Sequence, residues 1–233
     1  GATQTFTEAC EGGGTLTVVD NDANGNQQAD PGDSASLTAN NCAFGGEVLN
    51  GQLSITLNSV SGNLDSYPYT LSGTINFQKL TAQSTTARIV ANGSMTLNVS
   101  ARSDFDQTIA LAIASFAITS TYGGVTSSQT LTNYNSSLKV SLAGSVTNWT
   151  SSVKGTMTSS AFDSKSVSID TPVAFVRSGN QAYPARGEAI IIGAAGAKVR
   201  VTATSVTNVT IDLDADGNGS YETTVNKRWS EIL

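Results

Sequence analysis

The sequence predicts an all-β fold: a single domain over residues 1–233, built as an antiparallel meander of long strands. Three observations predict it. Apolar and polar residues alternate along many segments, which is typical of strands with one buried face. Serine and threonine number 30 each, so hydroxyl groups supply most polar positions in a chain with only 13% charged residues. No Pro/Gly/Ser-rich linker interrupts the pattern, and all-β folds of roughly this length often form one unit.

The alternation places strands in order along the chain. Its clearest segments are Leu53–Leu57, Met95–Val99, Leu138–Leu142, Val199–Val201 and Val209–Leu213. A sheet of such strands either curls into an open half-barrel or folds as a β-sandwich, and the sequence leaves both arrangements open.

Segment Ile109–Ile118 departs from the common pattern, because its first alternate positions are alanine rather than serine or threonine. This composition predicts a strand that is covered on both faces. A short buried helix is the alternative, since alanine and leucine favour helices.

A weak repeat also runs through the chain. Asn50–Leu57 resembles Asn92–Val99, which begins 42 residues later, and Asn135–Leu142 follows after 43 more. The first two copies begin with Asn-Gly, a pair that tolerates positive φ and suits tight turns. We therefore interpret the repeat as a series of hairpins in one antiparallel meander, with turns at the Asn-Gly pairs of the first two copies.

The C-terminal part, about residues 187–229, is predicted to be a four-stranded meander. Its strands are Ala189–Ile192, Lys198–Thr204, Val209–Leu213 and Tyr221–Trp229. The short turns between them make the strands antiparallel neighbours. Trp229 is the expected core anchor of this part.

Cys10 and Cys42 are the only cysteines. Two cysteines in an exported chain most simply form one disulfide, and a pair of buried free thiols is the alternative. A bridge between them would fix the N-terminal strands.

Two loops near opposite ends of the chain share the pattern D-x-D-x-[DN]-G-N, with an acidic residue ten positions after the first Asp. The candidate ligands of the first loop are Asp20, Asp22, Asn24, Asn26 and Asp30; those of the second are Asp212, Asp214, Asp216, Asn218 and Glu222. Ca²⁺ needs six to eight oxygen ligands, and a tight glycine-containing loop can supply several of them. The sequence therefore predicts structural calcium, although Asp, Asn and Gly also suit plain hairpin turns.

Composition excludes several function classes. Without histidine, the chain has no Ser-His-Asp or Cys-His nucleophile and no His-ligated zinc. A net charge of −6 argues against a nucleic-acid partner. No apolar run approaches the roughly 20 residues of a transmembrane helix. Acid pairs such as Asp104 with Asp106, or Asp163 with Asp170, are weak candidates for glycoside chemistry, so we expect a protein that is not an enzyme.

The C-terminal part resembles a module of uncharacterised exported proteins and lipoproteins of Gram-negative bacteria. The similarity covers about 50 residues, and it depends on Tyr183–Gly187, Gly193–Gly196, Val199–Ala203, Asp212–Glu222 and Trp229. An N-terminal segment also resembles this module: Asp20–Asp33, followed by Asn41-Cys42. This resemblance implies export, to the periplasm, the outer membrane or the medium, and Asp-rich calcium loops. It implies no reaction.

We therefore expect a non-enzymatic envelope or secreted protein with a structural or adhesive role, stabilised by calcium and one disulfide. A half-barrel would resemble bacterial envelope lipoprotein carriers, so a carrier of a lipid or another apolar ligand is the first alternative. A carbohydrate-active enzyme is the second. The partner classes left open are a lipid, a glycan or another envelope protein.

Overall fold

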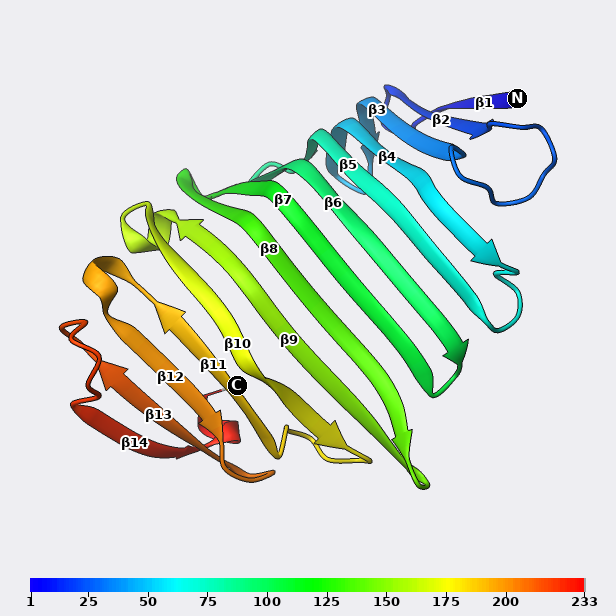
Figure 1. Cartoon of the computed structure of the whole chain (residues 1–233). Coiled ribbons are helices and arrows are strands. Elements are labelled where there is room, and N and C mark those ends of the chain that lie inside the picture. The colour runs from blue at the N-terminus through cyan, green and yellow to red at the C-terminus, as the bar shows by residue number, and fades with distance from the viewer. Residues whose placement is uncertain (233) are drawn as a thin grey trace.

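A computed structural model of the chain describes residues 1–232 and contains one sheet of 14 antiparallel strands (Figure 1). Each strand pairs with its neighbours in sequence. The strands are β1 (Ala2–Ala9), β2 (Thr15–Asp22), β3 (Ser34–Phe44), β4 (Glu47–Gly62), β5 (Tyr69–Gln83), β6 (Ala87–Ser103), β7 (Asp106–Tyr122), β8 (Val125–Ala143), β9 (Val146–Ser159), β10 (Lys165–Ser178), β11 (Arg186–Ile192), β12 (Lys198–Ala203), β13 (Asn208–Asp214) and β14 (Thr223–Arg228). Three single-turn 3-10 helices accompany them: η1 (Ser160–Phe162), η2 (Ala194–Gly196) and η3 (Trp229–Glu231).

The sheet is open, with β1 and β14 as its two edges (Figure 1). The prediction of an all-β antiparallel meander is confirmed. The β-sandwich alternative is wrong for the single chain, because all 14 strands belong to one sheet. The last four strands, β11 to β14, follow one another in the sheet with short connections.

The two faces of the sheet differ in chemistry, because residues that pair across strands share a face. One row crosses ten strands and is apolar throughout: Phe6, Val18, Leu37, Leu53, Phe77, Gly93, Phe116, Leu131, Met157 and Val167. A row on the other face is mainly hydroxyl and amide: Thr3, Asn21, Ser34, Thr56, Thr74, Thr96, Ala112, Asn135, Lys154 and Asp170. We call these the apolar face and the hydroxyl face.

Segment 109–118 lies inside strand β7, so the helix alternative is wrong. The expectation that it is covered on both faces is also wrong. Ile113 and Phe116 are buried, but Ile109 is 38% exposed and Ile118 is 39% exposed on the same face. The alanines that alternate with them lie on the hydroxyl face, next to the serine and asparagine of the adjacent strands.

The Asn-Gly pairs of the repeat lie in the middle of strands β4 and β6, so the predicted turns there are wrong. Each pair faces a β-bulge on the preceding strand, and Asn50-Gly51 also faces the bulge of the following strand, β5, which contains Lys79. The side-chain oxygen of Asn50 accepts the N–H of Asn41, and that of Asn92 accepts the N–H of Lys79. A side chain in place of Gly51 (φ 99°) would put its Cβ 2.4 Å from the Lys79 carbonyl oxygen. Glycine is required there because the bulge brings two backbones close together.

A small hydrophobic cluster closes the C-terminal end of the sheet. After β14 the chain turns back through η3 and packs Trp229 against Val209 and Ala203. Trp229 is only 5% exposed, and its ring also stacks on Tyr183 at a centroid distance of 6.2 Å. The expectation that Trp229 is a core anchor agrees with this packing.

The predicted disulfide between Cys10 and Cys42 is present, with a Cα–Cα distance of 5.3 Å. It joins the turn after β1 to strand β3. Backbone hydrogen bonds between Gly12 and Ala43, and between Ala43 and Gly13, hold the same two segments together. The bridge therefore fixes the N-terminal edge strands, which have little other burial.

Candidate functional site

The second Asp-rich loop, between β13 and β14, brings three predicted ligands together. Carboxylate oxygens of Asp214, Asp216 and Glu222 lie within 4.8 Å of one another. Asp214 is fully buried, while Asp216 and Glu222 are exposed. Elsewhere in residues 1–232, no other group of three such side chains comes this close.

Local hydrogen bonds fix the carboxylates of the second loop. The two oxygens of Asp214 accept the backbone N–H groups of Gly217 and Gly219, at 2.8 and 3.0 Å. One oxygen of Glu222 accepts the N–H of Ala215 at 2.9 Å. Asn218 donates from its side-chain amide to Asp216, so its nitrogen faces that carboxylate. The loop thus holds three carboxylates in place by its own backbone, as a hard cation would require.

The predicted ligand Asp212 does not join this cluster. The Arg200 guanidinium donates twice to one oxygen of Asp212, at 3.0 and 2.8 Å, and the Thr224 hydroxyl donates to the other at 2.6 Å. These donors hold the pKa of Asp212 below its ordinary value, with Thr224 the larger cause and Arg200 the next, against the opposing effect of burial. Cross-strand pairing with β12 and β14 explains the arrangement, because Asp212 is opposite both donors.

Replacing Arg200 with methionine is expected to lower the free energy of unfolding by about 2 kcal/mol, because it leaves a buried carboxylate with one charged donor fewer. Denaturant unfolding at neutral pH measures this change. Lys154→Met is the matched control, since the Lys154–Asp170 pair is exposed (72% and 48%) and should cost less than about 1 kcal/mol. Equal effects of the two substitutions would contradict the prediction.

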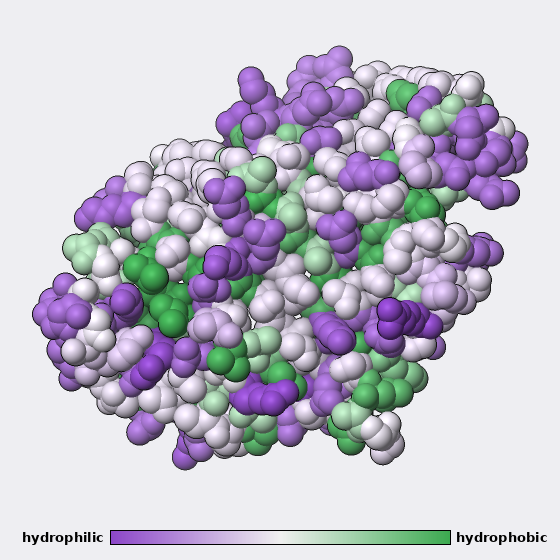
Figure 2. All heavy atoms as spheres, in the orientation of Figure 1, coloured by the Kyte–Doolittle hydropathy of each residue, from purple (hydrophilic) through white to green (hydrophobic). Residues whose placement is uncertain are grey.

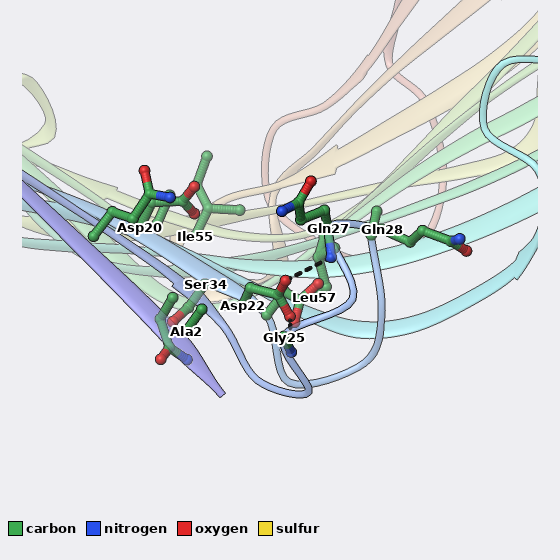
Figure 3. A pocket seen from close by; sticks show the side chains of 14 residues that line it. Ala2, Asp20, Asp22, Gly25, Gln27, Gln28, Ser34, Ile55 and Leu57 are labelled. Atoms are coloured by element: carbon green, nitrogen blue, oxygen red, sulfur yellow. Dashed lines mark hydrogen bonds between the residues drawn. The ribbon is translucent and has the colours of Figure 1, made fainter.

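The first Asp-rich loop, between β2 and β3, is organised differently. The side-chain amides of Asn24 and Asn26 both donate to Asp30, at 2.7 and 2.6 Å, so these amides present nitrogen rather than oxygen to the carboxylate. Asp22 accepts the backbone N–H groups of Gln27 and Gly25 (Figure 3), which lower its pKa, with Gln27 the larger cause. The structure therefore places four of the predicted residues of this loop, Asp22, Asn24, Asn26 and Asp30, in a hydrogen-bonded turn.

Asp20 lies apart from that turn, on β2 opposite Gln4 and Ala35. It lines a hollow of about 510 Å³ between the loop and the side chains of Ile55 and Leu57 (Figure 3). The two Asp-rich loops are at opposite ends of the strands, because they follow β2 and β13 in a strictly up-and-down meander. They cannot share an ion.

A second feature, which the sequence did not predict, lies at the centre of the hydroxyl face. Three shallow hollows of about 410, 300 and 210 Å³ adjoin one another there. The first hollow shares Ala112 and Asn135 with the second, and Asn98 and Ala110 with the third, so the three form one depression, which we call the polar trough. White and purple residues, of intermediate to hydrophilic hydropathy, cover most of the centre of the view in Figure 2, with green, hydrophobic residues visible between them.

The trough follows from side-chain size. Ala110 lies between Asn98 and Ser137 of the adjacent strands, and Ala112 lies between Thr96 and Asn135. The short methyl groups leave a low floor between longer polar walls. Asn98 and Ser137 line the trough on either side of Ala110. Lys154 and Asp170, 3.1 Å apart, close one end.

Three of the four carboxylates considered for glycoside chemistry have partners of their own. Asp104 accepts the hydroxyl of Tyr67 at 2.8 Å, which raises the pKa of that tyrosine. Asp170 pairs with Lys154, and Asp106 lies 4.0 Å from Arg102. Asp163 is in the turn after η1 with a left-handed backbone. The residues that line the trough include only one carboxylate, Asp170.

Within the described residues, no helix is both long and apolar enough to cross a membrane. Comparison of the chain with protein-family models, curated proteins and solved structures finds no match. The resemblance to exported proteins of Gram-negative bacteria therefore stays a prediction.

Proposed function

We propose that this chain is an exported, non-enzymatic protein with an adhesive or structural role, and that the polar trough contacts a neutral polysaccharide. The observation that carries the proposal is the trough itself: a long depression with an alanine floor and hydroxyl and amide walls, which crosses the longer strands β4 to β10. The disulfide supports export, because such bonds persist in oxidising compartments.

The chemistry of the trough suits a chain of sugars. Serine and threonine hydroxyls and asparagine amides both donate and accept hydrogen bonds, as sugar hydroxyls do. Adjacent strands are about 4.8 Å apart, close to the length of one hexose unit along a polysaccharide. A glycan that crosses the strands would therefore meet a similar set of polar groups at each step. The trough lining is not aromatic, so hydrogen bonds rather than ring stacking would supply the affinity.

Filling the trough tests this proposal. Ala112→Leu adds a branched side chain to the floor shared by two of the hollows and is expected to weaken polysaccharide binding at least tenfold. Ala117→Leu is the matched control, because Ala117 is on the same strand and the same face but outside the trough. Binding of a panel of neutral polysaccharides to the immobilised protein provides the measurement. Absence of binding by the unaltered protein, or an equal loss in both variants, would reject the trough as a glycan site.

We further propose that the second loop binds calcium as a structural ion. Asp214, Asp216 and Glu222 would supply the carboxylate ligands, since their oxygens already lie within 4.8 Å of one another. Three gathered carboxylates repel one another unless a cation neutralises them. The first loop is the weaker candidate, because Asn24 and Asn26 direct their nitrogens to Asp30.

Calcium should raise the melting temperature of the protein, and a chelator should lower it. A ligand present at a hundred times its Kd stabilises the folded state by about 2.7 kcal/mol, which is several degrees. Glu222→Gln should abolish the difference between the two conditions while the sheet remains folded, as circular dichroism would show. Asp30→Asn, in the first loop, serves as the control and should keep most of the shift. No difference between calcium and chelator would refute the metal proposal.

A further inference from the structure

The chain exposes more surface than a folded monomer of its size. Its accessible area is 13387 Å², whereas a monomeric protein of 23.9 kDa exposes about 9,900 Å². The surplus is about 3,500 Å². A single sheet has this property because neither face is covered by a second layer, and stable domains normally have at least two layers.

Of the two uncovered faces, the apolar face of the central strands is the one that burial would stabilise. At one end of that face, Trp229 and Tyr183 pack over Val209 and Ala203. At the other end, the first Asp-rich loop lies beside Ile55 and Leu57. Between them, apolar side chains of β6 to β8 remain more than a third exposed: Ile89, Ile109, Ile118 and Leu138. We call the apolar face of β4 to β9 the apolar centre.

Except for Glu47, the exposed first residue of β4, the apolar centre carries no charge. Cross-strand pairing places its residues in register, and the charged residues of these strands, such as Arg88, Lys139 and Lys154, are on the hydroxyl face. Glu8, Asp20, Arg177 and Lys227 share the apolar face, but they belong to the strands nearer the two edges. A second copy of the same surface therefore adds no buried charge, whereas a charged partner would find no counter-ion there.

The area of the uncovered apolar face also suits an interface with a second copy of the chain. A stable interface needs about 800 Å² from each partner. The surplus of about 3,500 Å² is divided between two faces, and even half of it, about 1,750 Å², leaves room for incomplete contact between two twisted sheets. Twisted sheets pack face to face with their strands about 30° apart, with side chains interdigitating between them. Identical faces make this contact self-complementary about a two-fold axis.

We propose that two copies of this chain pair through their apolar centres and form a two-fold dimer with the architecture of a β-sandwich. Each chain contributes one sheet, and the hydroxyl faces with their polar troughs point outward on both sides. This inference does not depend on the glycan proposal, because it concerns the opposite face.

Light scattering after size-exclusion chromatography tests the dimer on the full chain. The unaltered protein should have a mass of about 48 kDa, twice the 23.9 kDa of one chain. Ile109→Glu places a charge in the apolar centre, between Val99 and Leu138, and should shift the mass to about 24 kDa at the same concentration. Thr108→Glu, the adjacent residue on the hydroxyl face, should remain dimeric.

A second measurement covers the case in which Ile109→Glu does not fold. The melting temperature of the unaltered dimer should rise when its concentration is raised a hundredfold, because dissociation accompanies unfolding. A monomeric mass with a concentration-independent melting temperature would overturn the proposal. A monomer that retains added lipid mass in native mass spectrometry would also overturn it, and would assign the apolar centre to acyl chains instead.

Discussion

Replacing Trp229 with alanine is expected to lower the free energy of unfolding by about 3–5 kcal/mol, the range for removing a buried tryptophan or phenylalanine. Trp229 is 5% exposed and contacts Val209, which is completely buried. Its ring also meets Phe175 edge-on, at a centroid distance of 6.2 Å. Loss of the indole would leave a cavity at the place where η3 covers the end of the sheet, and the last strands would lose their cover.

Denaturant unfolding followed by circular dichroism measures this effect. Trp149→Ala is the matched control, because Trp149 is only partly buried on the same face and its ring lies under the Arg177 guanidinium, 4.6 Å away. Removing that partly exposed cation–π contact should cost roughly 1 kcal/mol in addition to the smaller loss of packing. If the two alanine variants were equally stable, η3 would not be the main cover of the C-terminal strands.

Removing the disulfide is also expected to lower the free energy of unfolding strongly. The bridge between Cys10 and Cys42 spans 32 residues, and closing a loop of that length stabilises the folded state by about 3.7 kcal/mol in the chain-entropy model. The bridged strands have little alternative support, since every residue of β1 is exposed. Without the bridge, we expect β1 and β2 to separate from the sheet before the central strands unfold.

The double variant Cys10→Ser with Cys42→Ala measures the effect without a free thiol. Its unfolding free energy should be lower by about 3–4 kcal/mol. Hydrogen exchange should show the loss concentrated in residues 2–22. A reducing agent should destabilise the unaltered protein by a similar amount and leave the variant unchanged. Uniform loss of protection across all strands would contradict the local role of the bridge.

Period-two alternation predicts the strands well. Successive side chains point to opposite faces of a strand, and the two faces of this sheet differ in chemistry, so apolar and polar residues alternate along the sequence. Leu53–Leu57 and Met95–Val99 therefore lie within β4 and β6 as expected. The Asn-Gly pairs misled the prediction, since Asn and Gly are as useful opposite a β-bulge as in a turn. Local sequence does not distinguish these uses, because the bulge is on the neighbouring strand.

The candidate site was predictable where it depended on one loop, and less so where it depended on neighbouring strands. Asp214, Asp216 and Glu222 come together because a short loop contains all three. Asp212 does not, because Arg200 and Thr224 are opposite it in the sheet, and its pairing depends on register. The polar trough had a signal in the alternate alanines of 109–118. The same alanines also fit a strand that is covered on both faces. The sequence alone does not show whether a second layer lies over the sheet.

The order of the strands has a consequence for how the protein folds. Every strand pairs with the one before it, so the sheet contains no crossover that must wait for a distant segment. Each completed strand presents a free edge on which the next strand can pair. Folding can therefore proceed during synthesis, from the N-terminal strands to the C-terminal ones. A premature stop would leave a shorter sheet with an exposed edge rather than an unfolded chain. The process ends at β14, where η3 turns back and places Trp229 on the finished sheet.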